Sequence, residues 1–262
     1  MSDPTDQPPS VAADPWTRLR QHTSARIALG RSGSSLPTGE VLRFALDHAL
    51  ARDAVHAELD EDQLESDLTK VAQGLPIVRV ATRVGDRATY LQRPDWGREL
   101  SPDSRQKLAA MAPAEGTDVC LILADGLSAT ATQRHAPALC GLLLSRLRDA
   151  RLTLATLVIA RYARVALQDD VGSALAARCS LILIGERPGL GTPDSLGGYL
   201  VFGPRIGNTD AQRNCVSNIR PQGLPLHAAA ETLHYLITQS LRRQISGVAL
   251  KDDRGVALPP AT

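Results

Sequence analysis

Short apolar segments alternate with segments of helical spacing in the second half of the chain. The predicted strands are 119–124, 152–160, 181–184 and a shorter segment at 199–202. The predicted helices are 137–149, 169–178 and 225–244. The strand segments lack the alternation of a half-exposed strand, which is typical of a parallel sheet with both faces covered. The order strand, helix, strand, helix, strand therefore predicts an α/β fold, with helices on both faces of a parallel Rossmann-like or flavodoxin-like sheet.

The first half of the chain has a different pattern. Helical spacing predicts helices over 40–54, 60–72 and 101–111. Apolar and polar residues alternate over 76–84, and a Gly85-Asp86 turn signal leads into a returning segment at 88–91. This arrangement predicts a β-hairpin within a mainly helical N-terminal extension.

The change of pattern at 113–116 predicts how the chain is divided. We expect a disordered tail over 1–14, which is rich in Pro, Asp and Ser, and a helical and hairpin region over 15–112. The α/β domain then covers 117–250, and a flexible tail covers 251–262.

Composition excludes several classes of function. The 262 residues carry a formal net charge of +1, which gives no electrostatic argument for binding nucleic acid or an anionic membrane. No segment approaches the roughly 20 apolar residues of a membrane span. The first residues lack the basic start and apolar run of a signal peptide, so we expect a protein that is not secreted and resides in the cytoplasm. The four cysteines form no Cys-x-x-Cys pair and no histidine cluster accompanies them, so no metal site is predicted.

Polar loops follow three of the predicted strands. They begin at Asp125, at Arg161 and at Gly185, and they carry carboxylates, guanidiniums and glycines. Ligands of open α/β sheets bind outside the carboxyl ends of the strands, so these loops are candidates for one binding edge. The other interpretation is that the charged residues bind no ligand and only keep the loop ends exposed to water. Glu186 could likewise accept hydrogen bonds from a ligand or pair with Arg187, and the sequence leaves both interpretations open.

The usual motifs of nucleophilic catalysis and phosphate binding are missing. Asp125-Gly-Leu-Ser128 is not a Gly-x-Ser-x-Gly elbow, and the glycine-rich segment 185–191 lacks the Lys-Ser/Thr of a Walker A loop. Cys215 lies in a polar segment, 212–218, that is predicted to be a loop without a neighbouring histidine. The residues therefore give poor support for nucleophilic catalysis by this chain.

Several motifs occur together in one order and resemble a known family. They are Asp125-Gly-Leu-Ser128, Arg161-Tyr-Ala-Arg-Val165, Gly185-Glu-Arg-Pro-Gly-Leu-Gly191 and Cys215-Val-Ser-Asn-Ile219, preceded by Arg93-Pro-Asp-Trp-Gly-Arg98, Thr23-Ser-Ala-Arg-Ile27 and Gly30-Arg-Ser-Gly33. From about residue 16 to about residue 248, the chain resembles the small (light) subunit of ethanolamine ammonia-lyase.

The resemblance implies a function for the complex and a role for this chain. The family's enzyme uses adenosylcobalamin to convert ethanolamine to acetaldehyde and ammonia through an adenosyl radical. Its large subunit holds ethanolamine, and the small subunit closes over the cofactor, in a hetero-oligomer of heterodimers. The resemblance implies that this chain alone is inactive. It also implies that residues 117–250 form a cobalamin-binding domain.

The resemblance also implies which residues contact adenosylcobalamin. These are Val165, Glu186 and Cys215, with Asp125, Arg161 and Arg187 as weaker candidates that shape the pocket. The cobalamin-ligating motif Asp-x-His-x-x-Gly is absent, which fits a family that keeps the cofactor's own base on cobalt.

Two departures from the family affect what can be carried over. The segment before Cys215 is one residue shorter than the family pattern. Location in a bacterial microcompartment is expected by resemblance, although residues 1–15 are shorter than the encapsulation-type extension of some members.

Two other functions remain open at this point. The chain could be a stand-alone nucleotide-binding or regulatory module, or a purely structural interaction subunit.

Overall fold

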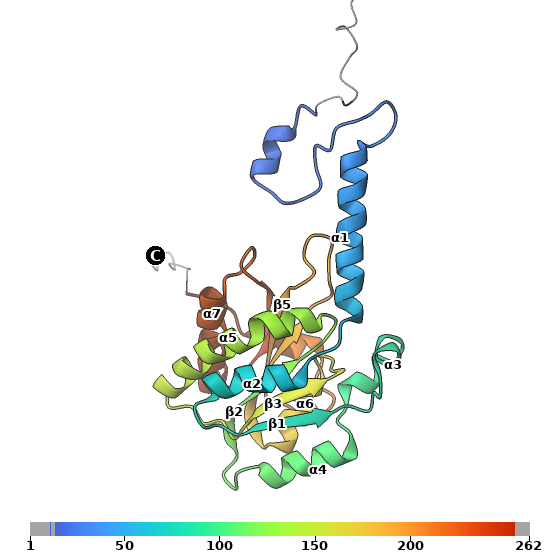
Figure 1. Ribbon diagram of the computed structural model, residues 1–262. Helices are drawn as coiled ribbons and strands as arrows, with labels where there is room; N and C mark the ends of the chain where they lie inside the picture. The colour runs from blue at the N-terminus through green and yellow to red at the C-terminus, as the bar shows by residue number, and fades with distance from the viewer. Residues whose placement is uncertain (1–10, 12–13, 255–262) are drawn as a thin grey trace, which may run out of the picture. The chain divides into compact units, whose positions relative to one another are not determined.

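The computed structural model describes residue 11 and residues 14–254 (Figure 1). The predicted tail over 1–14, and most of that over 251–262, lie outside these residues. Contacts divide the chain into two compact units. The first comprises the residues up to Asp53 with Gly189–Thr192, and the second comprises Ala54–Pro188 with the residues from Pro193 onward.

The second unit contains a six-stranded sheet with the order β1-β3-β2-β4-β5-β6. Its parallel strands are β1 (Ile77–Ala81), β2 (Thr117–Ala124), β3 (Leu157–Arg161) and β4 (Ala177–Gly185). Its antiparallel strands are β5 (Leu196–Phe202) and β6 (Arg213–Ile219). The predicted α/β class is confirmed, with a sheet that is mostly parallel rather than entirely so.

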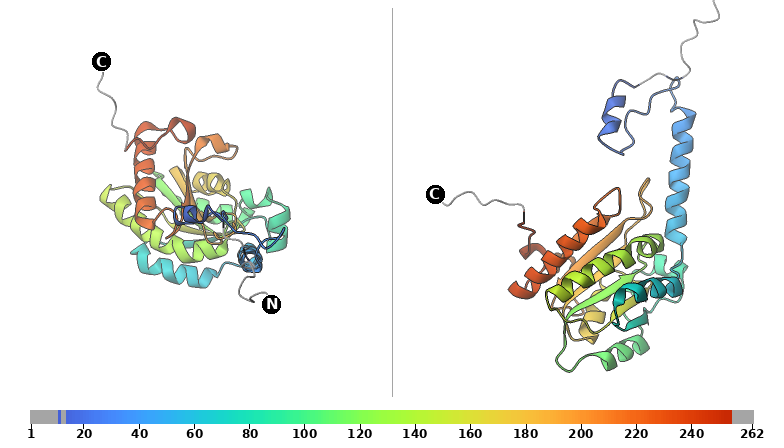
Figure 2. Two further views of the ribbon diagram at one scale, coloured as in Figure 1. Left: turned by 90° about the horizontal axis from the view of Figure 1, so that it is seen from above. Right: turned by 60° about the vertical axis from the view of Figure 1, so that its left-hand side comes forward.

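Helices cover both faces of this sheet (Figures 1 and 2). One face carries α2 (Glu61–Ala72), α5 (Ala129–Asp149) and α7 (Leu226–Arg243), and the other carries α4 (Pro102–Met111) and α6 (Leu167–Ala174). A hydrophobic core lies on each face of the sheet. Leu121 belongs to the core beneath α2, α5 and α7, and its neighbour Ile122 belongs to the core beneath α4 and α6. Each central strand therefore needs apolar residues at consecutive positions, which accounts for the missing alternation.

The remaining elements are shorter or belong to the first unit. They are η1 (Thr17–Gln21), α1 (Thr38–His56), α3 (Arg87–Gln92), η2 (Trp96–Arg98), η3 (Asp210–Gln212) and η4 (Gly247–Ala249). Within residues 14–254, no helix is long and apolar enough to cross a membrane.

The predicted hairpin is wrong. β1 pairs in parallel with β3, with Ile77 opposite Leu157, so it belongs to the main sheet. The chain after it forms helix α3, and the Asp86 carboxylate accepts the Thr89 N–H at 2.9 Å as its N-cap. Aspartate suits a helix start as well as a turn, and the sequence signal did not distinguish the two.

Two other boundaries also differ from the prediction. The segment 212–218, expected to be a loop, forms most of β6 at the sheet edge, where Cys215 and Ser217 are exposed. Helix α5 begins at Ala129 rather than near Pro137, because Ser128 Oγ accepts the Ala131 N–H at 3.2 Å and caps an earlier start.

Candidate functional site

Two adjoining cavities share the loop after β3. The loops after β2 and β4 line one of them, and the chain from 208 to 215 lines the other. The first, called here the Glu186 cavity, has a volume of about 450 Å³. The second, the Cys215 cavity, has a volume of about 710 Å³. Arg164, Val165 and Tyr199 line both cavities, so they form the boundary between them.

The structure brings the three predicted contact residues to this one edge of the sheet. Val165 lines both cavities, Glu186 lines the first and Cys215 lines the second. Of the weaker candidates, Arg187 lines the Glu186 cavity. Asp125 lies beneath the loops, and Arg161 faces a different cavity.

The Glu186 carboxylate is held by three neutral donors. Ser195 Oγ donates to Oε2 at 2.5 Å, Ser217 Oγ donates to Oε1 at 2.5 Å, and the Asn218 N–H donates to Oε2 at 3.1 Å. Within residues 14–254, Glu186 forms no ion pair, so the predicted alternative of pairing with Arg187 is not what the structure has. A carboxylate has about four acceptor sites, so it retains capacity for one more hydrogen bond.

Glycines allow the loops to approach closely enough to form this edge. A Cβ atom on Gly185 would overlap the Ser128 carbonyl oxygen, and one on Gly126 would overlap the Gly185 carbonyl oxygen. Gly126 also has a φ of +55°, a conformation that glycine adopts without strain. These two glycines thus hold the loops after β2 and β4 together and bring Glu186 to the cavity.

Asp125 fixes the loop after β3 from below. Its Oδ1 accepts the Gly126 N–H at 2.8 Å and the Ala163 N–H at 3.2 Å, and its Oδ2 faces Arg87 Nη1 at 3.3 Å. Burial raises the pKa of Asp125 to about 6, against the lowering effect of its hydrogen bonds and of Arg87. Asp125 therefore positions the loops from beneath the cavities.

Tyr90 supports the same loop from the side. Its hydroxyl donates to the Ala163 carbonyl oxygen at 2.9 Å, and the Arg164 guanidinium lies over its ring at 4.1 Å. The Arg164 Nη2 group also donates to the Tyr90 carbonyl oxygen at 3.0 Å. Arg164 belongs to the predicted edge segment 161–165, whereas the sequence prediction missed Tyr90 and Tyr199 as cavity residues. The nearest motif to Tyr90 begins at Arg93.

Cys215 lies directly opposite Tyr199 in the antiparallel pair of β6 and β5. The surrounding protein raises the pKa of the Cys215 thiol by disfavouring the thiolate, while the Tyr199 side chain lowers it. A thiol with a raised pKa is a poor nucleophile near neutral pH, which agrees with the expectation that Cys215 is a contact rather than a catalytic residue.

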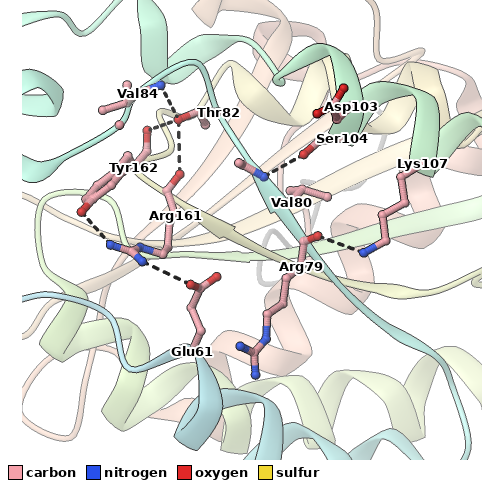
Figure 3. Close-up of a pocket in the computed structure, with 12 residues that line it drawn as sticks. Glu61, Arg79, Val80, Thr82, Val84, Asp103, Ser104, Lys107, Arg161 and Tyr162 are labelled. Carbon is pink, nitrogen blue, oxygen red and sulfur yellow. Dashed lines mark hydrogen bonds and ion pairs between the residues drawn. The ribbon is translucent and has the colours of Figure 1, made fainter.

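Arg161 faces a separate cavity of about 460 Å³ beside β1 and α4 (Figure 3). There its guanidinium lies 3.4 Å from the Glu61 carboxylate and donates to the Tyr162 hydroxyl at 2.7 Å. Arg79, on another wall, pairs with two carboxylates of α2. These cations are already paired, and Arg161 does not line either cavity at the loop edge.

Fold and site together define an α/β protein with two adjoining cavities at one edge of its mostly parallel sheet. The family model described as "Ethanolamine ammonia-lyase light chain (EutC)" matches residues 13–251. The chain therefore belongs to the ethanolamine ammonia-lyase light chain family.

Curated relatives agree with this membership. The chain is 52% identical over 235 residues to an ethanolamine ammonia-lyase small subunit of Rhodopseudomonas palustris, covering 90% of this chain and 89% of the relative. It is 48% identical over 255 residues to one of Azotobacter vinelandii, covering 97% and 93%. The resemblance predicted from the motifs is thus confirmed over most of the chain.

Proposed function

We propose that this chain is the cofactor-binding small subunit of an adenosylcobalamin-dependent ethanolamine ammonia-lyase. The observation that carries the proposal is the placement of Val165, Glu186 and Cys215 along two adjoining cavities at one edge of the sheet. Family membership supports a lyase subunit and does not favour a stand-alone nucleotide-binding module.

The residues present fit a large cofactor that has both apolar and amide surfaces. Val165, Ile184 and Leu127 supply apolar lining. Glu186 supplies an acceptor without a cationic partner, and Arg164 supplies a buried Nε–H without an acceptor within residues 14–254. Unsatisfied polar groups at a cavity are costly unless a ligand or water completes their hydrogen bonds. The bound cofactor supplies the radical chemistry, and the protein supplies orientation and electrostatics.

Each proposed contact residue has a distinct task in this account. Glu186 accepts a hydrogen bond from an amide or hydroxyl of the cofactor, and its three neutral donors keep the carboxylate turned toward the cavity. Val165 packs against the cofactor, and Cys215 contacts it as a neutral thiol. No residue of this chain is proposed to act on ethanolamine.

We also propose that a large subunit covers the cofactor from the opposite side. Cys215 is exposed, and Val165 and Glu186 are only partly buried, so this chain by itself would leave one side of the ligand in water. Radical reactions need exclusion of water and side reactants. The proposed assembly is a hetero-oligomer of heterodimers in which the isolated chain is inactive. It would reside in a bacterial microcompartment, as in part of the family, or otherwise in the cytoplasm.

Reconstitution tests this function. The chain is co-expressed with a large subunit of the same family, adenosylcobalamin and ethanolamine are added, and acetaldehyde is measured. We expect acetaldehyde only when both chains and the cofactor are present. Equal activity of the large subunit without this chain would contradict the proposal. Saturable nucleotide binding by the isolated chain would instead support the stand-alone module.

A further inference from the structure

The segment from Arg93 to Arg98 has no role in the function proposed so far, yet its end reaches the Cys215 cavity. The Gly97 carbonyl oxygen accepts the Arg164 N–H at 2.8 Å. A Cβ atom on Gly97 would lie 2.7 Å from the Tyr162 carbonyl oxygen, so only glycine permits this approach. The contact places Arg98 beside Arg164, and both arginines line the Cys215 cavity.

The charged lining of this cavity is predominantly positive. It contains Arg98, Arg164 and Arg213, with Asp210 as the acidic residue. Arg213 is buried, forms an ion pair with Asp169 and lies 3.1 Å from the Asp210 carboxylate. The charge of Arg213 is therefore already balanced by residues of this chain.

The charges of Arg98 and Arg164 are not balanced in this way by carboxylates of the described part of this chain. Within residues 14–254, neither forms an ion pair, and the Arg98 side chain makes no hydrogen bond. Arg164 donates from Nη2 to a backbone carbonyl, while its buried Nε has no partner. Two neighbouring guanidiniums that face one cavity, and that have no carboxylate paired with them, attract an anion.

We propose that Arg98 and Arg164 form an anion subsite of the Cys215 cavity that holds the phosphodiester of the cofactor. This inference rests on the proposed function for the identity of the ligand. The corrin side chains of adenosylcobalamin are neutral amides, and its nucleotide loop carries a phosphodiester, which is the group that arginine binds best through its planar fork of donors. The subsite gives the cofactor one orientation across the two cavities, with the phosphodiester in the Cys215 cavity and an amide or hydroxyl at Glu186.

Binding of two ligands to the reconstituted two-subunit complex tests the subsite. Adenosylcobalamin is compared with adenosylcobinamide, which keeps the corrin and the adenosyl group but lacks the phosphodiester, and dissociation constants are measured by equilibrium dialysis. Arg164→Gln should weaken adenosylcobalamin binding about 10- to 100-fold, the range for a lost charged hydrogen bond. Arg98→Gln should weaken it in the same direction, and neither change should affect adenosylcobinamide.

Two features of the design keep the result interpretable. Arg98 has no side-chain partner within residues 14–254, so its replacement does not disturb the loops, whereas Arg164 also packs on Tyr90. Arg151→Gln removes an exposed arginine from the turn after α5 and should leave both dissociation constants unchanged. A second readout uses sodium chloride. Added salt should weaken adenosylcobalamin binding to the wild type more steeply than binding to Arg98→Gln.

The outcomes separate the subsite from the function on which it rests. Equal losses for both ligands, or unchanged binding in Arg98→Gln with an unchanged salt dependence, would overturn the subsite and leave the function standing. Absence of saturable adenosylcobalamin binding by the wild-type complex would overturn both.

Discussion

Ser217 Oγ donates a hydrogen bond to Glu186 Oε1 at 2.5 Å, which joins the edge strand β6 to the loop after β4. The same carboxylate accepts from Ser195 at the start of the returning chain. Glu186 is therefore a junction between three segments, and its orientation depends on Ser195 and on Ser217, which also lines the Glu186 cavity.

Ser217→Ala should weaken adenosylcobalamin binding by the two-subunit complex through loss of this orientation. The lost hydrogen bond has a charged acceptor and is worth about 1.5–3 kcal/mol, but Glu186 keeps two other donors, so we expect a smaller loss of about 2- to 12-fold in affinity. Ser217 is exposed, so the thermal unfolding temperature should stay constant. Ser66→Ala, at an exposed position of α2, is the matched control. A drop in stability without a change in affinity would show that Ser217 serves the fold only.

Tyr90→Phe should destabilise the chain while the ring remains beneath Arg164. The change removes the donor at 2.9 Å from the buried Ala163 carbonyl oxygen, which costs about 1 kcal/mol in the free energy of unfolding. Denaturant unfolding measures the loss. Tyr235→Phe, on α7, is the control, because no hydrogen bond from its hydroxyl is found within residues 14–254. Equal stability of the two variants would count against the role of Tyr90 in holding the loop.

Gly185→Ala should be among the most damaging single substitutions at the edge. The added Cβ overlaps the Ser128 carbonyl oxygen, which is backbone and cannot move aside cheaply. We expect a loss of more than about 2 kcal/mol in the free energy of unfolding. Gly85→Ala adds the same atom in open space and should change stability little. Similar unfolding midpoints for the two variants would contradict the close loop packing described above.

The buried Asp125 should make stability depend on pH. Its pKa is raised from 3.8 to about 6 in the folded chain, so between these values the folded state binds more protons than the unfolded state. Stability contributed by protonated Asp125 is therefore present below about pH 4 and is lost as the pH rises to about 6, with an upper limit of about 3 kcal/mol.

Urea unfolding of wild type and Asp125→Asn between pH 4 and 7 measures this contribution. The variant should lack the corresponding part of the slope. Asp169, whose pKa burial also raises to about 6, contributes a slope of the same sign that remains in the variant. Superimposable pH profiles of the two proteins would show that Asp125 does not titrate in this range.

Much of the fold follows from local sequence signals, and the incorrect predictions of individual strands have physical causes. The runs around Leu121 and Leu181 are apolar at consecutive positions because helices cover both faces of the sheet, and consecutive apolar residues are typical of such strands. β6 was missed because its exposed side carries Cys215 and Ser217, so its composition is that of a loop. The local pattern predicts a hairpin for β1 because strand pairing between residues far apart leaves no local trace.

The candidate site was predictable only in part. The loop order located Val165 and Glu186, since parallel strands end at one edge of the sheet. Arg161 was grouped with them by sequence, yet it is the last residue of β3 and faces the cavity beside β1. Gly97 and Tyr90 come from a segment more than 60 residues before the Arg164 loop that they support, and local pattern gives no sign of such a contact.

The central claim is that Glu186 binds adenosylcobalamin at this edge, and the affinity of the two-subunit complex for the cofactor tests it most directly. Equilibrium dialysis should show binding weakened by about 1–3 kcal/mol, or about 5- to 150-fold, in Glu186→Ala, because a polar partner of the ligand is lost. Glu115→Ala, at an exposed loop position on the amino-terminal side of β2, should bind like the wild type. An unchanged dissociation constant for Glu186→Ala in a correctly assembled complex would contradict the account.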